Sequence, residues 1–144
     1  MTLAHLFHPN GCYAYRIEHE GKALVFSTDC EHYEDRPNKN LIELCQDADA
    51  LIYDAQYTED EYYGLNGEFS RKGWGHSTMQ EGVKVAKAAN VEKLILFHHD
   101  PTHNDNFIKK IETESRKLFP QSIAAYEGLQ IDLSQNELPK SLFD

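Results

Sequence analysis

The sequence is poor in cysteine and in long hydrophobic runs, and each shortage excludes a class of protein. Its three cysteines form no C-x-x-C pattern and are too sparse for a secreted disulfide scaffold, which favours a reducing, cytoplasmic compartment. No hydrophobic run approaches the roughly 20 residues that span a bilayer. The opening segment MTLAHLFHPN also lacks the pattern of a signal peptide. We therefore expect a protein that is neither exported nor embedded in a membrane.

Positive charge is also scarce. Lys and Arg number 14 against 24 Asp and Glu, which gives a formal net charge of -10. The field of such a chain repels phosphate backbones and anionic membranes, so nucleic acid is not expected as a bulk ligand. The length of 144 residues and a hydrophobic content of 40% are nevertheless sufficient for one packed domain over residues 1–144.

Hydrophobic periodicity predicts an alternation of strands and helices, β-β-α-β-α-β-α-β-β, which defines an α/β fold class. Residues 56–75 have no clear period and are typical of a functional loop or lid, with room for a short helix near 58–63. Residues 134–144 are polar and are expected to fray. The predicted strands are 12–18, 23–27, 50–53 and 93–97, the predicted helices are 40–47, 77–90 and 105–119, and a last hairpin is predicted from 122–126 to 129–133.

Polar side chains follow the strands of this alternation that should run parallel. Asp29, Asp54 and His98 each stand at or just after the end of such a strand, and parallel strands share the edge where α/β sheets bind ligands. His76 stands at the entrance of a helix beside the same sheet. His8 precedes the first predicted strand, which pairs antiparallel and so begins at that edge. The topology therefore predicts that imidazoles and carboxylates converge there.

Mixed imidazole and carboxylate ligands suit Zn²⁺, and also Mn²⁺ or Fe. A single His or Asp at a strand end is more often an ordinary turn or cap residue. When several such residues share one edge of the sheet, metal binding becomes the favoured interpretation. The cluster HHDPTHND has its own structural interpretation, an Asx turn followed by a helix capped by Asn104 or Asp105.

At these residues the sequence resembles the metallo-β-lactamase superfamily, and more specifically its phosphodiesterase-like hydrolases related to ribonuclease Z. The resemblance implies that His8, Asp29 and His98 bind metal, with Asp29 able to bridge two ions. It also implies that His76 assists the leaving group and that Asp54 orients His76. The matching segments, in order, are His8-Pro9-Asn10-Gly11 followed by Tyr15-Arg16-Ile17-Glu18, then Leu24-Val25-Phe26-Ser27-Thr28-Asp29, Gly75-His76-Ser77-Thr78 and Leu94-Ile95-Leu96-Phe97-His98.

The signature H-x-H-x-D-H of that superfamily is absent, and the chain resembles the carboxy-terminal half of its αββα sandwich. Half a sandwich leaves an apolar sheet face without its partner. A second copy in a homodimer, a separate chain bearing the missing half, or a rearrangement of the chain's own elements would have to cover that face.

The resemblance thus implies a metal-dependent, phosphodiesterase-like hydrolase that uses a metal-activated water. The alternatives are a degenerate, non-catalytic half-domain that binds metal or a partner, and a truncated piece of a longer hydrolase. Phosphodiesters, cyclic nucleotides, RNA ends, thioesters and lactams are all substrates on this scaffold, and the fold does not choose among them.

Overall fold

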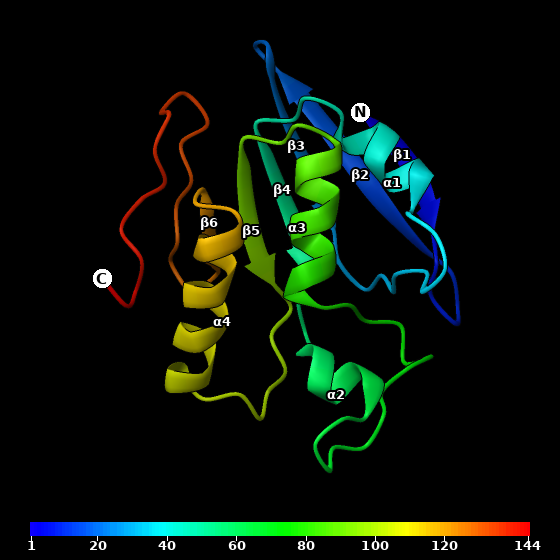
Figure 1. Cartoon of the computed structure of the whole chain (residues 1–144). Helices are drawn as coiled ribbons and strands as arrows, with labels where there is room; N and C mark the ends of the chain where they lie inside the picture. Colours follow the sequence, from blue (N-terminus) through cyan, green and yellow to red (C-terminus); the bar gives the residue numbers. More distant parts are fainter.

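A mixed sheet of six strands, in the order β1-β2-β3-β4-β5-β6, organises the computed structural model, which describes residues 1–144. Helices α1, α3 and α4 lie on one face of the sheet, and α2 lies beyond the carboxyl ends of its parallel strands (Figure 1). The strands are β1 (Thr2–Leu6), β2 (Cys12–His19), β3 (Lys22–Ser27), β4 (Ala50–Asp54), β5 (Lys93–Phe97) and β6 (Ser122–Ala124). The helices are α1 (Lys39–Cys45), α2 (Glu59–Tyr63), α3 (Met79–Ala88) and α4 (Asp105–Leu118).

The sheet changes from antiparallel to parallel in its middle. Strands β1, β2 and β3 pair antiparallel, whereas β3, β4, β5 and β6 pair parallel. The turn between β2 and β3 holds Glu20 at a φ of 50° and Gly21 at a φ of 78°, a left-handed pair that suits the twist of a tight hairpin. The predicted parallel arrangement of the three strands that precede the polar residues is confirmed.

Short polar side chains begin the helices where the sequence pattern indicated. The carbonyl oxygen of the Asn104 side chain accepts from the Phe107 amide at 3.1 Å and caps α4. At α2, Thr58 and Glu61 form a reciprocal capping box, in which Glu61 Oε2 accepts from the Thr58 amide at 2.8 Å. This cap starts the short helix inside the segment predicted as a loop. None of the helices has the length and apolar character required to cross a membrane.

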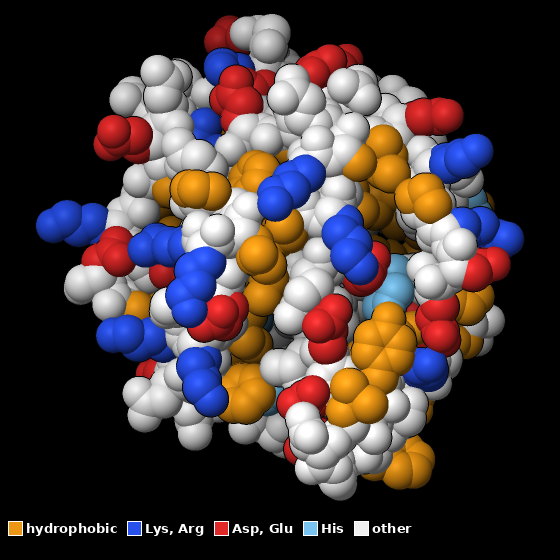
Figure 2. Space-filling view, in the orientation of Figure 1, with side chains coloured by type: hydrophobic (Ala, Val, Ile, Leu, Met, Phe, Trp, Pro, Cys, Tyr) orange, Lys and Arg blue, Asp and Glu red, His pale blue; other side chains and the backbone are white.

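The main core lies between the sheet and its helices. It is a cluster of 23 buried residues in which Leu51, Leu94 and Leu96 of the central strands meet Leu41 of α1 and Val83 of α3. Figure 2 shows this helical side from outside, with acidic and basic side chains intermixed and hydrophobic side chains mainly between them. Burial of this one face therefore accounts for most of the hydrophobic stabilisation of the fold.

The opposite face of the sheet is covered over only part of its width. Over β4, β5 and β6, the C-terminal residues Leu129, Ile131 and Leu133 pack around a small cluster that includes Ile95 and Ile123. On this face, opposite the helices, no other element covers β1 and β2. The large hydrophobic side chains there are 39–54% exposed, and they are Leu3, Tyr13, Tyr15 and Ile17.

The predicted α/β class is confirmed, and two details of the predicted order are corrected. Strand β1 was not predicted, and it has only one fully buried side chain, Leu6. The predicted hairpin from 122–126 to 129–133 is wrong: β6 instead joins the sheet parallel to β5. The alternating apolar residues at 129–133 pack on the small cluster of the sheet face rather than pairing with a strand, because burial there removes their apolar surface from water. Residues 134–144 form no helix or strand, and Asp144 pairs with Arg116 of α4 at 3.0 Å.

Candidate metal centre

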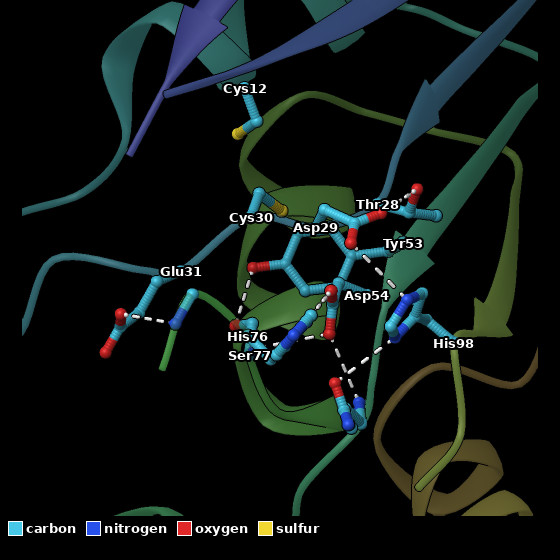
Figure 3. A network of polar contacts seen from close by, with 12 residues as sticks. Cys12, Thr28, Asp29, Cys30, Glu31, Tyr53, Asp54, His76, Ser77 and His98 are labelled. Carbon is cyan, nitrogen blue, oxygen red and sulfur yellow. Dashed lines mark hydrogen bonds and ion pairs between the residues drawn. The ribbon is translucent and has the colours of Figure 1, made fainter. Parts of the chain in front are cut away.

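The carboxyl ends of the central parallel strands gather the polar residues picked out by the sequence. Asp29 follows β3, Asp54 ends β4 and His98 follows β5. His76 enters from the segment before α3. Figure 3 shows these side chains directed toward a common region between the strand ends.

Asp29, His76 and His98 form the tightest group, referred to below as the trio. One ligand atom from each lies within 4.8 Å of those of the others. Asp29 Oδ1 is 3.5 Å from His98 Nε2. The imidazoles of His76 and His98 stack with their centroids 4.8 Å apart and their planes inclined by 18°. The Asp29 side chain is 55% exposed and that of His76 is 15% exposed, so the trio is open to solvent on the Asp29 side.

Asp54 fixes the orientation of the His76 ring through a hydrogen bond. Its carboxylate is fully buried and accepts from His76 Nδ1 at 2.9 Å through Oδ2. Its other oxygen accepts from the Ser77 amide at 3.2 Å and the Gln56 amide at 3.3 Å. Because Nδ1 is engaged by Asp54, Nε2 is the ring atom of His76 left for external chemistry. Burial lowers the pKa of His76, but the hydrogen bond to Asp54 and its negative charge outweigh burial and raise that pKa above its ordinary value.

Gln56 connects Asp54 to His98 and was not singled out from the sequence. Its side-chain oxygen Oε1 lies 3.2 Å from His98 Nδ1, which orients the ring so that Nε2 faces Asp29. Its own backbone amide donates to Asp54. A glutamine in a polar loop carries no sequence signal for this role, because its partner lies 42 residues away.

Two members of the trio occupy unfavourable backbone conformations. Asp29 has a φ of 52° and His98 a φ of 60°, in the left-handed region that L-residues with a Cβ rarely adopt. Each such residue costs on the order of 1 kcal/mol or more, and such residues concentrate at functional sites. Both strands thus turn sharply at the sheet edge and aim their first polar side chains at the same space.

His8 lies beside the trio. Its ring centroid is 6.2 Å from that of His76, and its Nδ1 accepts from the Asn10 amide at 3.1 Å. Gly75 packs so closely that a Cβ at this position would collide with the His8 imidazole, and its φ of 92° also requires glycine. His8 is therefore held against the segment that carries His76.

A buried carboxylate, Glu31, fixes the loop that leads into His76. Glu31 is 2% exposed, and its Oε1 accepts from the Tyr62 hydroxyl and the Gly73 amide, each at 2.7 Å. Its Oε2 accepts from the Gly75 amide at 3.0 Å. Glu31 carries no sequence signal for this role, because two of its donors are backbone amides, which almost every residue possesses.

The remaining histidines of the cluster HHDPTHND lie outside the trio. His103 Nε2 is 2.8 Å from Glu61 Oε1, and the contact joins the start of α4 to α2. His99 is largely buried, and burial lowers its pKa. Cys30, beside Asp29, is buried against Ser27, and burial raises the pKa of its thiol well above the ordinary value.

A mixed sheet with helices on one face, and with carboxylate and imidazole side chains at the carboxyl ends of its parallel strands, is the architecture expected of a metallo-β-lactamase-like α/β domain. The family model described as "Beta-lactamase superfamily domain" matches residues 1–99. The chain therefore belongs to this superfamily, and its relatives place it near ribonuclease Z.

Ribonuclease Z of Archaeoglobus fulgidus is 31% identical over 121 residues, which cover 81% of this chain and 34% of that protein. The chain thus spans about a third of the length of the curated relatives it matches. The crystal structure of the short form of human tRNase Z has a TM-score of 0.66 at 20% identity and covers 91% of this chain and 42% of its own. Zn²⁺-bound PqqB from Methylobacterium extorquens has a TM-score of 0.66 at 21% identity and covers 90% of this chain and 46% of its own.

The names of the ribonuclease relatives can be compared with the expectation about nucleic acid that was based on net charge. They describe enzymes of RNA, so they give no support to the expectation that nucleic acid is unlikely as a bulk ligand. Net charge describes the field far from the molecule, whereas a local site is governed by the groups within it.

Proposed function

We propose that this chain forms part of a metal-dependent hydrolase site of the phosphodiesterase type, with His8, Asp29 and His98 as metal ligands. The observation that supports this most directly is the convergence of Asp29 and His98 with His76, within 4.8 Å, from segments far apart in the sequence. The unfavourable backbone conformations of Asp29 and His98 also support a functional role for both.

The donors present fit a divalent transition metal. Imidazole nitrogen with carboxylate oxygen suits Zn²⁺ first and Mn²⁺ or Fe as alternatives. The zinc-bound PqqB neighbour supports the same choice. Hydrogen bonding of His98 Nδ1 to Gln56 is the kind of contact that orients an imidazole ligand and leaves Nε2 available. When bound, such an ion supplies an activated water and neutralises charge on the phosphoryl group.

His76 is proposed as the group that gives a proton to the departing oxygen. Asp54 keeps a proton on Nδ1 and raises the pKa of the ring, which favours a second, transferable proton on Nε2 near neutral pH. The same geometry is compatible with Nε2 of His76 as a further metal ligand, because carboxylate-bound imidazoles are common at metal sites.

A partner is proposed to cover the open sheet face, either a second copy of this chain or a chain that carries further metal donors. The exposed Tyr13, Tyr15 and Ile17 support this, because contiguous apolar patches mark interaction surfaces. A site for two ions also needs more donors than this group provides. The three free cysteines are consistent with the proposed cytoplasmic location.

Calorimetric titration with Zn²⁺ tests the ligand assignment. We expect His98→Gln, Asp29→Asn and His8→Gln each to weaken Zn²⁺ binding by more than about tenfold. His19→Gln is the matched control, because the His19 side chain is 83% exposed and lies at the far end of β2. Equal Zn²⁺ affinity in all of these proteins would contradict the proposed site.

Hydrolysis of a generic phosphodiester tests the role of His76. We expect His76→Gln to lower kcat by about 10²–10⁴-fold while Zn²⁺ affinity stays within about threefold of the parent protein. A parallel loss of Zn²⁺ affinity would identify His76 as a ligand and remove its proposed role as proton donor. A protein that binds Zn²⁺ but turns over no phosphodiester would instead favour the alternative, a non-catalytic metal-binding or interaction half-domain.

A further inference from the structure

The buried carboxylate of Glu31 has only uncharged hydrogen-bond donors as partners. They are the hydroxyl of Tyr62 and the backbone amides of Gly73 and Gly75. A carboxylate that is removed from water and meets no cation is costly unless hydrogen bonds satisfy its oxygens. Because hydrogen bonds to an ionised acceptor are stronger than neutral ones, the same contacts also fix the groups that donate them. Glu31 therefore holds α2 and the loop before His76 in place.

Glu31 also connects the segments that lead to His8 and to His76. Its backbone amide donates to the carbonyl oxygen of Phe7 at 2.8 Å, and Phe7 directly precedes His8. Its Oε2 atom accepts from the amide of Gly75 at 3.0 Å, and Gly75 directly precedes His76. Figure 3 shows the Glu31 side chain directed toward the chain segment before His76. One residue thus joins two segments that are far apart in the sequence.

The position of Glu31 in the chain adds a third segment. Glu31 follows Asp29 by two residues, and Asp29 has a φ of 52°. A strained backbone conformation of this kind persists only where surrounding contacts fix it. The hydrogen bonds of Glu31 supply such contacts directly after the turn at Asp29. The segments of three candidate site residues therefore meet at this one glutamate.

A second buried glutamate has contacts of the same kind elsewhere in the fold. Glu112 is 3% exposed, and its Oε2 atom accepts from the Ala124 amide at 2.8 Å. Its Oε1 atom lies 3.2 Å from Nη2 of Arg116. These contacts join α4 to β6, and neither element carries a candidate site residue. Glu112 thus matches Glu31 in burial and in its backbone partner, but it connects other parts of the chain.

We propose that Glu31 is a positioning residue of the candidate metal centre, which keeps the segments of His8, Asp29 and His76 at fixed distances from one another. This inference rests on the proposed function and adds to it a residue that contacts neither metal nor substrate. Glu31 acts through the backbone of the three segments. It does not belong to the main core, so weakening its hydrogen bonds is expected to separate these segments while the core stays packed.

Nuclear magnetic resonance of the metal-free protein tests this role in Glu31→Gln. The substitution keeps the shape of the side chain and replaces one acceptor oxygen by an amide group that cannot accept from a backbone N–H. The ring centroids of His8 and His76 are 6.2 Å apart, so the parent protein should show a nuclear Overhauser cross-peak between their ring protons. We expect this cross-peak to be lost in Glu31→Gln. The Gly75 amide should exchange about 10–150-fold faster, the factor that corresponds to loss of one hydrogen bond to a charged acceptor.

Calorimetric titration with Zn²⁺ is the second measurement, and Glu112→Gln is the matched control. We expect Glu31→Gln to raise the Kd for Zn²⁺ about tenfold, as contacts behind metal ligands do, and Glu112→Gln to leave it unchanged. Tyr62→Phe tests the proposal if Glu31→Gln does not fold, because it removes one of the three donors and keeps the aromatic ring. It is expected to speed exchange of the Gly75 amide about 2–10-fold.

Retention of the cross-peak between His8 and His76, or an unchanged Kd for Zn²⁺, in Glu31→Gln would overturn the positioning role. Absence of the cross-peak from the parent protein would also overturn it. Equal changes in Glu112→Gln would have the same consequence, because they would reflect a general loss of stability. A parent protein that binds no Zn²⁺ would remove the proposed metal ligands, whereas loss of the cross-peak in Glu31→Gln would still support the positioning role.

Discussion

The two faces of the one sheet have very different environments. The helical face buries a cluster of 23 residues, whereas the largest buried cluster on the opposite face has 3 residues. The strands that form both faces are the same, so the difference comes from what packs on them. The helical face therefore supplies most of the buried core, and part of the opposite face stays exposed and available for contacts.

The opposite face is itself divided. The segment after β6 lays Leu129, Ile131 and Leu133 over the parallel strands, while Tyr15 and Ile17 on β2 stay exposed. The covered half is the half next to β6, from which the C-terminal segment continues. Substitutions placed in these regions test how far each one contributes to stability or to association.

The largest effect is expected on the helical face. Leu96→Ala removes a fully buried side chain of β5 from the main core, and such truncations cost about 2–5 kcal/mol. The matched substitution Ile17→Ala is expected to cost less than about 1 kcal/mol, because Ile17 is 46% exposed. Urea unfolding of the two variants measures both values. Similar losses in both would show that the open face contributes to the core as much as the helical face does.

A smaller effect is expected where the C-terminal segment covers the sheet. Ile131→Ser removes a half-buried side chain that packs against the small cluster, and we expect a loss of about 1–2 kcal/mol in the free energy of unfolding. Leu142→Ser is the control, because Leu142 belongs to the same terminal segment but is 56% exposed. Chemical denaturation followed by circular dichroism gives both values. No difference between the variants would mean that this segment does not stabilise the sheet.

Acidification is expected to weaken the helical side through His32. Burial lowers its pKa below the ordinary value of 6.5, and the attraction of Glu81, Glu31 and Glu34 and the repulsion of Lys84 are smaller influences. The unfolded chain therefore binds the proton first, so stability is full above pH 6.5 and falls as the pH drops below it. The slope is at most about 1.4 kcal/mol per pH unit for one proton.

Thermal unfolding across this pH range, with His32→Gln compared against His19→Gln, measures that slope. The first variant should lose part of the pH dependence and the second should keep it, since the His19 side chain is 83% exposed. A slope unchanged in His32→Gln would assign the acid sensitivity to other groups.

The smallest effect on stability, and the largest on association, is expected on the open face. The double substitution Tyr15→Lys and Ile17→Lys should change the free energy of unfolding by less than about 0.5 kcal/mol. It should abolish any dimer or partner complex that covers this face, because buried unpaired charge is costly. Light scattering of both proteins measures the association. A parent chain that stays monomeric at high concentration would exclude the homodimer.

Local pattern was sufficient to predict much of the fold. Apolar runs such as 93–97 identify strands, and Asn104 identifies the start of a helix, because both depend on neighbours in the sequence. The edge strand β1 was not predicted, because its side chains are mostly exposed, and the final hairpin was predicted incorrectly, because residues 129–133 fit a strand and a covering segment equally well. Where these two segments pack depends on which apolar surfaces lie near them in the folded chain, and the local sequence does not specify those surfaces.

The amino-acid sequence by itself determined that Asp29, Asp54 and His98 stand at the ends of parallel strands, because short apolar runs and the helices between them dictate that topology. Only the tertiary structure decided how those side chains are held. Asp54 meets His76 across 22 residues, Gln56 meets His98 across 42, and Glu31 meets the Gly75 amide across 44. Hydrogen bonds of this kind depend on distance and direction in space, and residue spacing along a chain does not encode either.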